Sequence, residues 1–561
     1  MKSIDREALL EWAREVADAY LSGAASLFLL HSNVFDLVLY KGEALTLREF
    51  LLRALLGIKE TVIFYNISEG LAFSDAISER RFLAGIGRAR KGTLPREPTD
   101  VLLLLERFIR TGDRNAAVII DYVNQVAPAS LSPSFLGTSD RMTSTTLQRW
   151  ALDPQILRSD TIILLITQHL SEVTDGIRRS PQVRVIRVPL PDRGERLLFI
   201  EHLLKTVPDV TLADGTPEQL AEVTAGLMRL HLLHLFREAK GDGKKVIRLS
   251  DITERKKMII EGECGGLVEF LKPTYGLDAV AGMEEVKRIL RQVIQFIREG
   301  EYAKAPMGIA FIGPMGTAKT FTATAFAGEC GMACLQFRNI YERWVGASEG
   351  NLEKILDVVE ALGPVVLIID EIDRAMTGSR SEGDSGTSSR IYARLKEFMS
   401  ETSHRGRIIT LVMSNRPDRV DPDIFRAGRI DLKVPFFLPE TPGEQEAILR
   451  KMAEKNGIAL RVTDFSNVTE RMKGASGADL EAVILLSAQI ADERGHQEVS
   501  DDDLNTAAHD YIPLRDEETI RYMTLLAVSY CSSRRLLPER FREVSGEELG
   551  RRIREMVIRI S

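Results

Sequence analysis

Cysteine and histidine are scarce in this chain, and their scarcity excludes a class of enzyme. Of 561 residues, 4 are cysteine and 8 are histidine. The HExxH motif of zinc proteases does not occur. Cys330 and Cys334 lie four positions apart on a predicted helix, but no second pair or nearby histidine completes a metal-binding set. We therefore interpret these cysteines as small hydrophobic residues and expect no metalloprotease.

Long apolar runs are also lacking, which argues against a membrane protein. The nearest candidate, LSGAASLFLLHSNVFDLVLY (21–40), is interrupted by His31, Asn33 and Asp36. The N-terminal stretch MKSIDREALLEW lacks the apolar core of a secretion signal. We expect no membrane partner and, by default, a cytoplasmic location.

An excess of positive charge is missing as well. The formal net charge is -7, which makes nucleic acid an unlikely main partner. The composition, with 44% hydrophobic and 28% charged residues and no low-complexity tract, is typical of a globular protein. A chain of this length is expected to form about two to four domains.

The second half of the chain alternates predicted strands and helices. The segments GIAFIG, PVVLIIDE, RIITLVMSN and DLKVPFFLP are apolar and read as strands, and TFTATAFAGEC reads as a helix. This rhythm predicts an α/β domain with a doubly wound parallel sheet, whose ligands bind at the carboxyl ends of the strands. From about residue 441 the pattern becomes helical, which predicts a small all-α lid.

The first half repeats this rhythm without the same chemistry. AAVIIDYV (116–123) resembles VVLIIDEI (365–372), with Tyr122 where the second half has Glu371. Asp121 precedes Gln168 by 47 positions, and Asp370 precedes Asn415 by 45. We favour an internal duplication over two unrelated α/β domains. Because no lysine-bearing glycine loop follows the early strand SLFLLHSNVFDLV, the first half is expected to bind no nucleotide.

A glycine-bearing loop between a predicted strand and a predicted helix is a candidate phosphate site. It runs through Gly313, Pro314, Met315, Gly316, Thr317, Ala318, Lys319 and Thr320. Backbone amides at the helix start would hold phosphates, Lys319 would neutralise their charge, and the Thr320 hydroxyl would bind Mg²⁺. Taken alone, the octamer could also be a glycine turn with a chance lysine.

An acidic pair, Asp370 and Glu371, closes the strand PVVLIIDE 51 residues after Lys319. Asp370 suits a metal shell, and Glu371 suits polarising an attacking water molecule. The pair could instead cap the next helix, although the nearby phosphate loop makes that the lesser alternative. Asn415 ends the next strand, where its side chain could place the same water molecule.

Two arginines, Arg426 and Arg429, follow in the segment DIFRAGRID. The ordinary interpretation is a solvated basic turn. Alternatively they neutralise charge at a phosphate site, a contribution typically worth about 10³–10⁵ in rate when it comes from outside the site. If they act on a neighbouring subunit, catalysis requires a ring.

Together these motifs give residues 273–510 a resemblance to an AAA+ ATPase of the AAA clade, which holds the valosin-containing-protein-type and proteasomal unfoldases. Three features carry it: Walker A at 313–320, Walker B VVLIIDE, and a polar residue, Asn415, beginning NRPDRVDPDIFRAGRID. The lid signature GASGADLEAV completes the set. The resemblance implies ATP, Mg²⁺ and a hexameric ring, with Arg426 and Arg429 acting in trans.

The resemblance also implies further nucleotide contacts. Gly477 and Ala478 of the lid signature correspond to residues that lie against the nucleotide. The stretch DAVAGM (278–283) matches the segment that brackets adenine, and departs from the pattern with Ala281 in place of glycine.

Ala318 stands where the phosphate-loop pattern has glycine before the lysine. The same GTAK sequence resembles the loop of minichromosome-maintenance helicases, which are active ATPases. An added methyl group is tolerated if Ala318 has helical dihedral angles, because only a positive φ demands glycine. We expect that conformation, a tight turn at Gly316, and a working site.

The stretch YERWVGASEGNLEKIL contains Trp344 and Val345, which with Gly346 resemble the pore loop that grips polypeptide in AAA unfoldases. An aromatic side chain on a loop suits grip without sequence preference, and a core tryptophan is the alternative. A polar loop, 377–390, could face the same pore or lie on the surface. The favoured hypothesis is ATP-driven remodelling of a polypeptide substrate. The alternative is a nucleotide-switched assembly or disassembly factor for a partner complex, without processive threading.

These observations predict four domains: a degenerate AAA-like domain (1–260), an ATPase α/β core (261–440), a helical lid (441–510) and a C-terminal helical extension (511–561). The basic, amphipathic extension could dock a partner or pack on the lid. Arg178 and Arg179 occupy the position in the first half that Arg426 occupies in the second, and we expect them to be structural.

Overall fold

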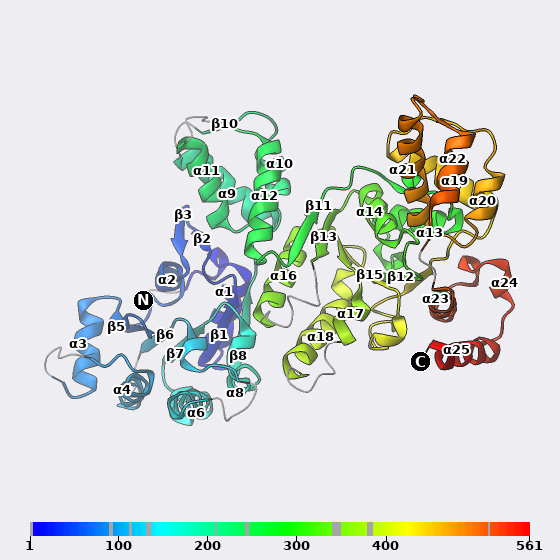
Figure 1. The fold of residues 1–561 in the computed structure, drawn as a ribbon. Helices are drawn as coiled ribbons and strands as arrows, with labels where there is room; N and C mark the ends of the chain where they lie inside the picture. Colours follow the sequence, from blue (N-terminus) through cyan, green and yellow to red (C-terminus); the bar gives the residue numbers. More distant parts are fainter. Residues whose placement is uncertain are drawn as a thin grey trace. The chain divides into compact units, whose positions relative to one another are not determined.

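The computed structural model describes residues 4–88, 94–111, 115–130, 136–207, 210–241, 246–338, 349–377, 385–513 and 516–560. The chain divides into two compact units. The first contains Met1–Cys264 and Ala347–Ala361, and the second contains Gly265–Gly346 and Leu362–Ser561. Figure 1 follows the chain through both units from blue to red.

The first unit is built on a sheet of 6 strands in the order β5-β4-β6-β7-β1-β8. Its pairs are parallel except for β4 and β5 at one edge. The strands are β1 (Leu27–Ser32), β4 (Thr61–Asn66), β5 (Gly70–Phe73), β6 (Ala116–Ile120), β7 (Thr161–Ile166) and β8 (Val183–Val188). Its helices before residue 180 are α1 (Glu11–Leu21), α2 (Leu47–Phe50), α3 (Ala76–Gly85), α4 (Pro98–Arg110), α5 (Val123–Val126), α6 (Thr138–Leu152), α7 (Pro154–Arg158) and α8 (Asp175–Arg178).

The second unit contains another sheet of 6 strands, in the order β11-β13-β14-β15-β12-β16. Only the edge pair β11 and β13 is antiparallel. The strands are β11 (Val268–Leu271), β12 (Gly308–Ile312), β13 (Ala333–Phe337), β14 (Val365–Ile369), β15 (Ile408–Ser414) and β16 (Leu432–Pro435). The helices of this α/β layer are α13 (Glu284–Arg298), α14 (Lys319–Cys330), α17 (Ile372–Thr377) and α18 (Ser385–Ser400), while most of α16 (Glu349–Leu362) belongs to the first unit. The α/β fold class predicted for both halves is confirmed.

The two sheets share one topology, which supports the internal duplication. Both place the first parallel strand of the domain, β1 or β12, between its last and next-to-last strands. Ile120 pairs with Leu165 in the first sheet, and Ile369 pairs with Val412 in the second. Asp121 and Asp370, which follow Ile120 and Ile369, therefore stand at the same register in the two sheets. The next residues, Tyr122 and Glu371, both have positive φ, at 53° and 49°. The antiparallel edge strand differs, because β5 follows its neighbour in the chain whereas β11 precedes the whole sheet.

Each unit also carries a helical lid, and the first of these was not predicted from the sequence. The lid of the first unit contains α9 (Arg193–Thr206), α10 (Pro217–Val223), α11 (Arg229–Gly241) and α12 (Leu249–Glu263). The lid of the second contains α19 (Pro442–Lys455), α20 (Ser466–Arg471), α21 (Gly477–Glu493) and α22 (Asp501–Asp510), drawn in yellow and orange in Figure 1. Short parallel pairs recur in both, β9 (Thr211–Leu212) with β10 (Val246–Ile247) and β17 (Leu460–Arg461) with β18 (Val499–Ser500). The lids therefore also support the duplication.

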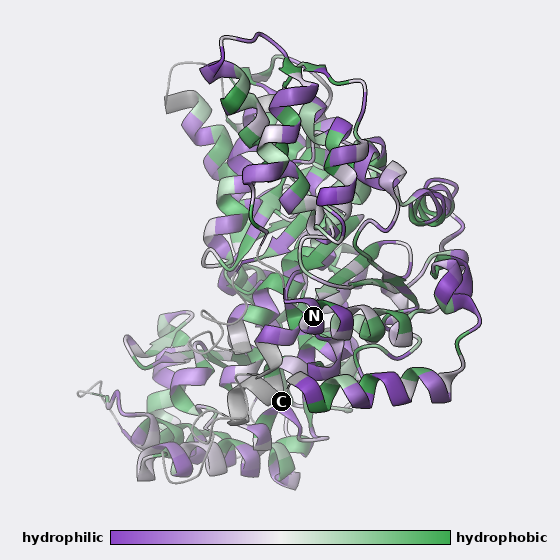
Figure 2. Cartoon of the chain, turned by 45° about the vertical axis from the view of Figure 1, so that its right-hand side comes forward, coloured by the Kyte–Doolittle hydropathy of each residue, from purple (hydrophilic) through white to green (hydrophobic). Residues whose placement is uncertain are grey.

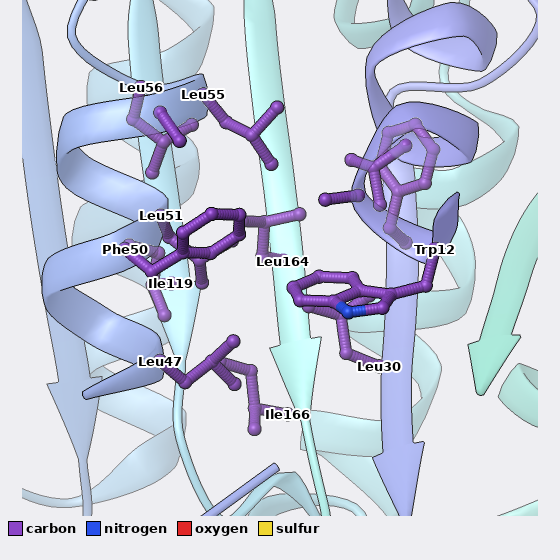
Figure 3. Packing of buried hydrophobic residues seen from close by; sticks show 14 of the residues in the cluster. Trp12, Leu30, Leu47, Phe50, Leu51, Leu55, Leu56, Ile119, Leu164 and Ile166 are labelled. Carbon is purple, nitrogen blue, oxygen red and sulfur yellow. The ribbon is translucent and has the colours of Figure 1, made fainter. Parts of the chain in front are cut away.

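The first sheet is buried on both faces, as its unbroken apolar strands predict. Alternate residues of β1 enter different clusters, with Phe28 and Leu30 on one face and Leu27 and Leu29 on the other. Figure 3 shows the face on which the Trp12 indole approaches the Phe50 ring, with centroids 5.5 Å apart.

The C-terminal extension contains α23 (Glu517–Tyr530), α24 (Glu539–Arg542) and α25 (Gly546–Ile560). Its core cluster includes Phe437, and α23 packs beside β16 and the turn Pro417–Arg419. α23 therefore covers the α/β layer, while Tyr511 at the start of the extension donates a hydrogen bond to Asp479 of the lid. Figure 2 shows alternating hydrophilic and hydrophobic bands on the helix beside the C mark.

Cys330 and Cys334 lie on different elements of the second unit. Cys330 ends α14 whereas Cys334 lies on β13, so the prediction that they share one helix is wrong. Both side chains are buried, and burial raises the pKa of the Cys330 thiol to about 11. Among the residues that the structure describes, no helix is long and apolar enough to cross a membrane.

Candidate nucleotide site

The predicted phosphate loop joins β12 to α14, so the strand-loop-helix context expected for Lys319 is present. The Lys319 Nζ donates hydrogen bonds to the carbonyl oxygens of Gly313 (3.0 Å) and Pro314 (2.7 Å). Lys319 is only 9% exposed, and burial lowers its pKa to about 8 despite the opposing charge of Asp370. An anion bound here would restore the stability of the charged ammonium.

At two positions of the loop, Gly313 and Gly316, neighbouring atoms lie too close to leave room for a Cβ atom. A Cβ atom at Gly313 would lie 2.2 Å from the carbonyl oxygen of Phe436. Gly316 has φ of 74°, and a Cβ atom there would lie 2.6 Å from Ser476 in the lid. The tight turn predicted at Gly316 is therefore present. Thr317 is buried and donates its hydroxyl to the Pro314 carbonyl at 2.8 Å, while Met315 is exposed.

Ala318 does not have the helical dihedral angles that the sequence argument required. Its φ is 62° and its ψ is 27°, in the left-handed region, where it immediately precedes α14. That expectation is wrong, because the loop turns into the helix through a conformation that glycine would adopt without strain. A Cβ atom in this region costs about 1–2 kcal/mol. The chain tolerates a strained residue next to Lys319.

Thr320 and Asp370 meet across the site. The Thr320 hydroxyl donates a 2.9 Å hydrogen bond to Oδ2 of Asp370, and Oδ1 of Asp370 accepts a 2.8 Å bond from the backbone amide of Glu371. Glu371 has φ of 49°, and its carboxylate lies 3.0 Å from the Arg374 guanidinium. The two carboxylates of the acidic pair thus have different partners, the Thr320 hydroxyl for Asp370 and the Arg374 guanidinium for Glu371.

Asn415 lies one residue beyond β15 and carries a buried Oδ1 that lacks a hydrogen-bond partner among the described residues. Such an atom is costly unless a ligand or water molecule satisfies it. The preceding residue is held by Asp373, whose Oδ1 accepts a 2.7 Å bond from the Ser414 hydroxyl. Sequence reasoning missed Asp373, although its spacing, three residues after Asp370 at the start of α17, could have revealed it.

The lid residues implied by the resemblance lie beside the loop. The Gly477 amide donates a 3.0 Å bond to the carbonyl oxygen of Gly316, and Ala478 lies 3.7 Å from the place a Cβ atom would take on Gly316. Ala281 is half-buried between Val280, which is buried, and Gly282, which has φ of 64°.

The two predicted finger arginines have different environments. The Arg426 side chain is 73% exposed and lies 3.0 Å from Asp423. Arg429 donates to the Ser400 hydroxyl at 2.6 Å and to the Asp423 carbonyl at 2.7 Å, within its own subunit. Arg426 is therefore exposed, whereas Arg429 is engaged within the chain. Trp344, Val345 and the segment 378–384 lie outside the described residues.

The residues present fit a nucleotide with a divalent cation. The buried ammonium of Lys319 and the amides at the start of α14 would hold phosphates, and Thr320 and Asp370 would hold Mg²⁺ through oxygen ligands. The bound cation would supply charge stabilisation for phosphoryl transfer. Glu371 would accept a proton from water, and Asn415 would orient that water through its unsatisfied oxygen.

Comparison with known families matches three segments of the chain. Residues 4–189 match the AAA+ chaperone, N-terminal Rossmann-like domain. Residues 194–265 match the AAA+ chaperone, second helical domain. Residues 309–438 match the ATPase family associated with various cellular activities (AAA).

Several individual proteins are similar in sequence to parts of this chain. The ATP-dependent zinc metalloprotease FtsH 3 of Sphaerobacter thermophilus is 31% identical over 45% of this chain and 53% of its own length. The Cell division cycle protein 48 homolog of Archaeoglobus fulgidus is 24% identical over 67% of this chain and 54% of its own. An uncharacterized AAA domain-containing protein ycf46 of Trieres chinensis is 29% identical over 63% and 71%. The chain spans about half the length of the first two relatives.

Proposed function

Because this chain belongs to the AAA+ ATPases, which hydrolyse ATP with Mg²⁺, we propose that it uses ATP hydrolysis to remodel or unfold polypeptide. The observation that carries the proposal is the meeting of Lys319, Thr320 and Asp370 in the second unit. That unit brings together residues suited to phosphate and Mg²⁺, whereas the first unit keeps the fold without a lysine-bearing loop. The matched families of the first unit are described as AAA+ chaperone domains, which supports a protein substrate.

The proposed grip on polypeptide comes from Trp344 and Val345. A large aromatic side chain contacts many different sequences through apolar area alone. Since this stretch lies outside the described residues, the argument for it rests on the sequence WVG and its place between β13 and α16. The residues would act in a central pore, so the proposal requires a ring.

The arginines support a homo-oligomeric ring, and the proposal of six subunits follows from the resemblance to AAA+ ATPases. The exposed guanidinium of Arg426 is paired only with the nearby Asp423 among the interactions of the described residues. A neighbouring subunit could receive it beside its own phosphates. An arginine supplied in this way is worth about 10³–10⁵ in turnover.

The alternative function is a nucleotide-switched assembly or disassembly factor. The first unit favours it, because a complete AAA-like fold that lacks the phosphate-loop lysine is suited to serve as a partner platform. In this alternative the nucleotide state of the second unit would switch one partner complex without pulling a chain through a pore.

The experiment has two parts. Steady-state ATP hydrolysis per subunit would be followed over a protein dilution series, with Glu371→Gln as the inactive reference. Turnover that rises with concentration supports a site completed by neighbours, and turnover at the level of the reference throughout would overturn the ATP-driven proposal.

The second part compares Trp344→Ala with Trp344→Phe in ATP-dependent unfolding of a destabilised fluorescent protein. Loss of unfolding in the alanine variant with retention in the phenylalanine variant supports aromatic grip. Equal unfolding by the native protein and both variants would instead favour the switch without threading.

A further inference from the structure

The loop after β1 occupies, in the first unit, the position of the phosphate loop in the second. β1 lies between β7 and β8, just as β12 lies between β15 and β16. The chain then continues through residues 33–36 into a hairpin of β2 (Leu37–Tyr40) and β3 (Glu43–Thr46), before α2 begins. The glycine loop and its lysine are thus replaced by the short segment NVFD (33–36), which contains no glycine or lysine and ends in Asp36.

The Asp36 carboxylate binds the start of a lid helix. Its Oδ2 accepts a 3.0 Å hydrogen bond from the Arg229 amide, and its Oδ1 accepts a 2.8 Å bond from the Leu230 amide. The Asn33 side chain donates a further bond of 3.1 Å to Oδ2. Asp36 is 3% exposed, so these bonds are made away from water. Two amides at the start of the 13-residue helix α11 therefore hold one buried anion.

Arg229 extends this contact into a buried network. Its guanidinium lies 3.7 Å from Asp36 and 3.1 Å from Glu195 on α9, and it donates to the Leu37 carbonyl at 3.3 Å. Arg229 itself is 4% exposed. Since a buried charge is tolerated only when it is paired and hydrogen-bonded, each member of this set depends on the others. The network joins the loop after β1 to two lid helices.

The equivalent contact in the second unit is much weaker. There the start of α21 reaches the loop through one bond, from the Gly477 amide to the Gly316 carbonyl, and no carboxylate of the loop is present. α11 and α21 are each the third helix of their lid. The first unit thus places a carboxylate of its own at the position in the fold where the second unit has the candidate phosphate loop.

We propose that Asp36 is a built-in substitute for a nucleotide phosphate, which holds the lid of the first unit closed on its sheet at all times. The charge, the helix-start amides and the paired arginine are the elements that an anionic ligand would require. The first unit is therefore a platform of constant shape that does not respond to ATP. This inference goes beyond the proposed function, because it concerns the unit without a lysine-bearing glycine loop and holds whether or not the second unit threads polypeptide.

Hydrogen–deuterium exchange on the full-length protein tests the proposal. Peptides covering α11 in the native protein should exchange slowly and equally with and without ATP. Asp36→Ala should raise their exchange by about tenfold or more and should also loosen α9, because both helices lose their shared anchor. Strand β6, in the same unit, should stay protected, which shows that the domain remains folded.

Two further variants make the result specific. Asp36→Asn keeps the volume but turns one oxygen into a donor facing the Arg229 amide, so it should loosen α11 even if the alanine variant fails to fold. Asp75→Ala is the matched control, because Asp75 also accepts two amide bonds of 2.8 Å, from Ile77 and Ser78, but only at the exposed start of α3. It should affect α3 alone.

The opposite results would overturn the proposal that Asp36 holds the lid of the first unit closed. Unchanged exchange of α11 and α9 in both Asp36 variants would show that the lid is held by other contacts. A response of α11 to ATP in the native protein would show that the first lid moves with nucleotide. The exchange of α21 with and without ATP is measured in the same experiment, in a protein that also carries Glu371→Gln. It reports on the second unit alone, so a failure of ATP binding there would be recognised independently.

Discussion

The Thr320 hydroxyl donates a 2.9 Å hydrogen bond to the Asp370 carboxylate, which joins the start of α14 to the end of β14. Fifty residues separate the two in the chain. This bond places a hydroxyl and a carboxylate at the distance at which both could turn toward one cation. Binding of Mg²⁺ would exchange the bond between them for two bonds to the metal.

The first prediction separates metal binding from proton transfer. Asp370→Asn should raise the Mg²⁺ concentration needed for nucleotide binding, because an amide is a weaker ligand for a hard cation. Glu371→Gln should keep Mg²⁺-dependent nucleotide binding and lower turnover by about 10²–10⁴, the usual contribution of a general base. Titration of a fluorescent ATP analogue with Mg²⁺, alongside steady-state hydrolysis, measures both. Equal loss of binding in the two variants would contradict these separate roles.

The second prediction concerns Ala318. Ala318→Gly should stabilise the second unit by about 0.5–1 kcal/mol, because relief of left-handed strain exceeds the entropy that glycine adds to the unfolded chain. Ala447→Gly in α19 is the control, and should instead lose up to about 1 kcal/mol, since it puts glycine inside a helix. Denaturant unfolding of the two variants measures the difference. A destabilised Ala318→Gly protein would mean that the strain is absent.

The third prediction follows from the pKa of Lys319, which burial lowers to about 8. Triphosphate binding requires the protonated ammonium, so affinity should fall as pH rises through this value. The apparent Kd for ATP should be about tenfold weaker at pH 9 than at pH 7, because the protonated fraction falls by that factor. Binding titrations at constant ionic strength test this, and Lys319→Met should bind weakly with a flat pH profile.

The free energy of unfolding should depend on pH in the opposite direction from the affinity for ATP. The folded-state pKa of Lys319 lies below that of the unfolded chain, so between about pH 8 and pH 10 the unfolded chain binds more protons. The contribution of Lys319 to the stability of the ligand-free protein should therefore increase with pH in that window. Comparison of native and Lys319→Met proteins by denaturant unfolding isolates it, and a contribution that falls with pH would contradict the lowered pKa.

The fourth prediction distinguishes the two arginines. Arg426→Ala should leave stability within about 0.5 kcal/mol of the native value, as for most exposed residues, and should remove most turnover. Arg429→Ala should lower stability by about 1–3 kcal/mol, because it removes bonds to Ser400 and Asp423. Subunits carrying Glu371→Gln and subunits carrying Arg426→Ala should regain activity when mixed, since each supplies what the other lacks. A mixture without activity would argue against action in trans.

The fifth prediction concerns Tyr522 on α23. Its hydroxyl donates to Asp418 at 3.1 Å, and its ring lies 4.8 Å from the Arg416 guanidinium, directly after Asn415. Tyr522→Phe should reduce kcat several-fold with little change in KM, because it loosens the segment that carries Asn415 without touching the phosphate loop. Tyr511→Phe, which removes a 2.7 Å bond to Asp479 in the lid, is the matched control. Equal effects of the two variants would refute a specific link to Asn415.

Sequence patterns by themselves determined the strand-helix rhythm, the candidate nucleotide residues and the lack of a lysine-bearing glycine loop in the first half. Apolar runs record which strands are buried on both faces, and the spacing from Lys319 to Asp370 records two strand ends on one edge of a sheet. These signals are local, because each depends on backbone periodicity or on a few adjacent residues. They do not report which side chains meet after the chain has folded.

Tertiary structure alone decided the remaining features. Asp36 and Arg229 lie 193 positions apart, and no local pattern pairs a loop carboxylate with the start of a lid helix. Arg429 is held within its subunit and Arg426 is exposed, although both belong to one short basic segment. The left-handed φ of Ala318 is likewise set by how the loop must enter α14. Each outcome depends on packing between distant segments, because burial decides which charges must find partners and which backbone angles are imposed.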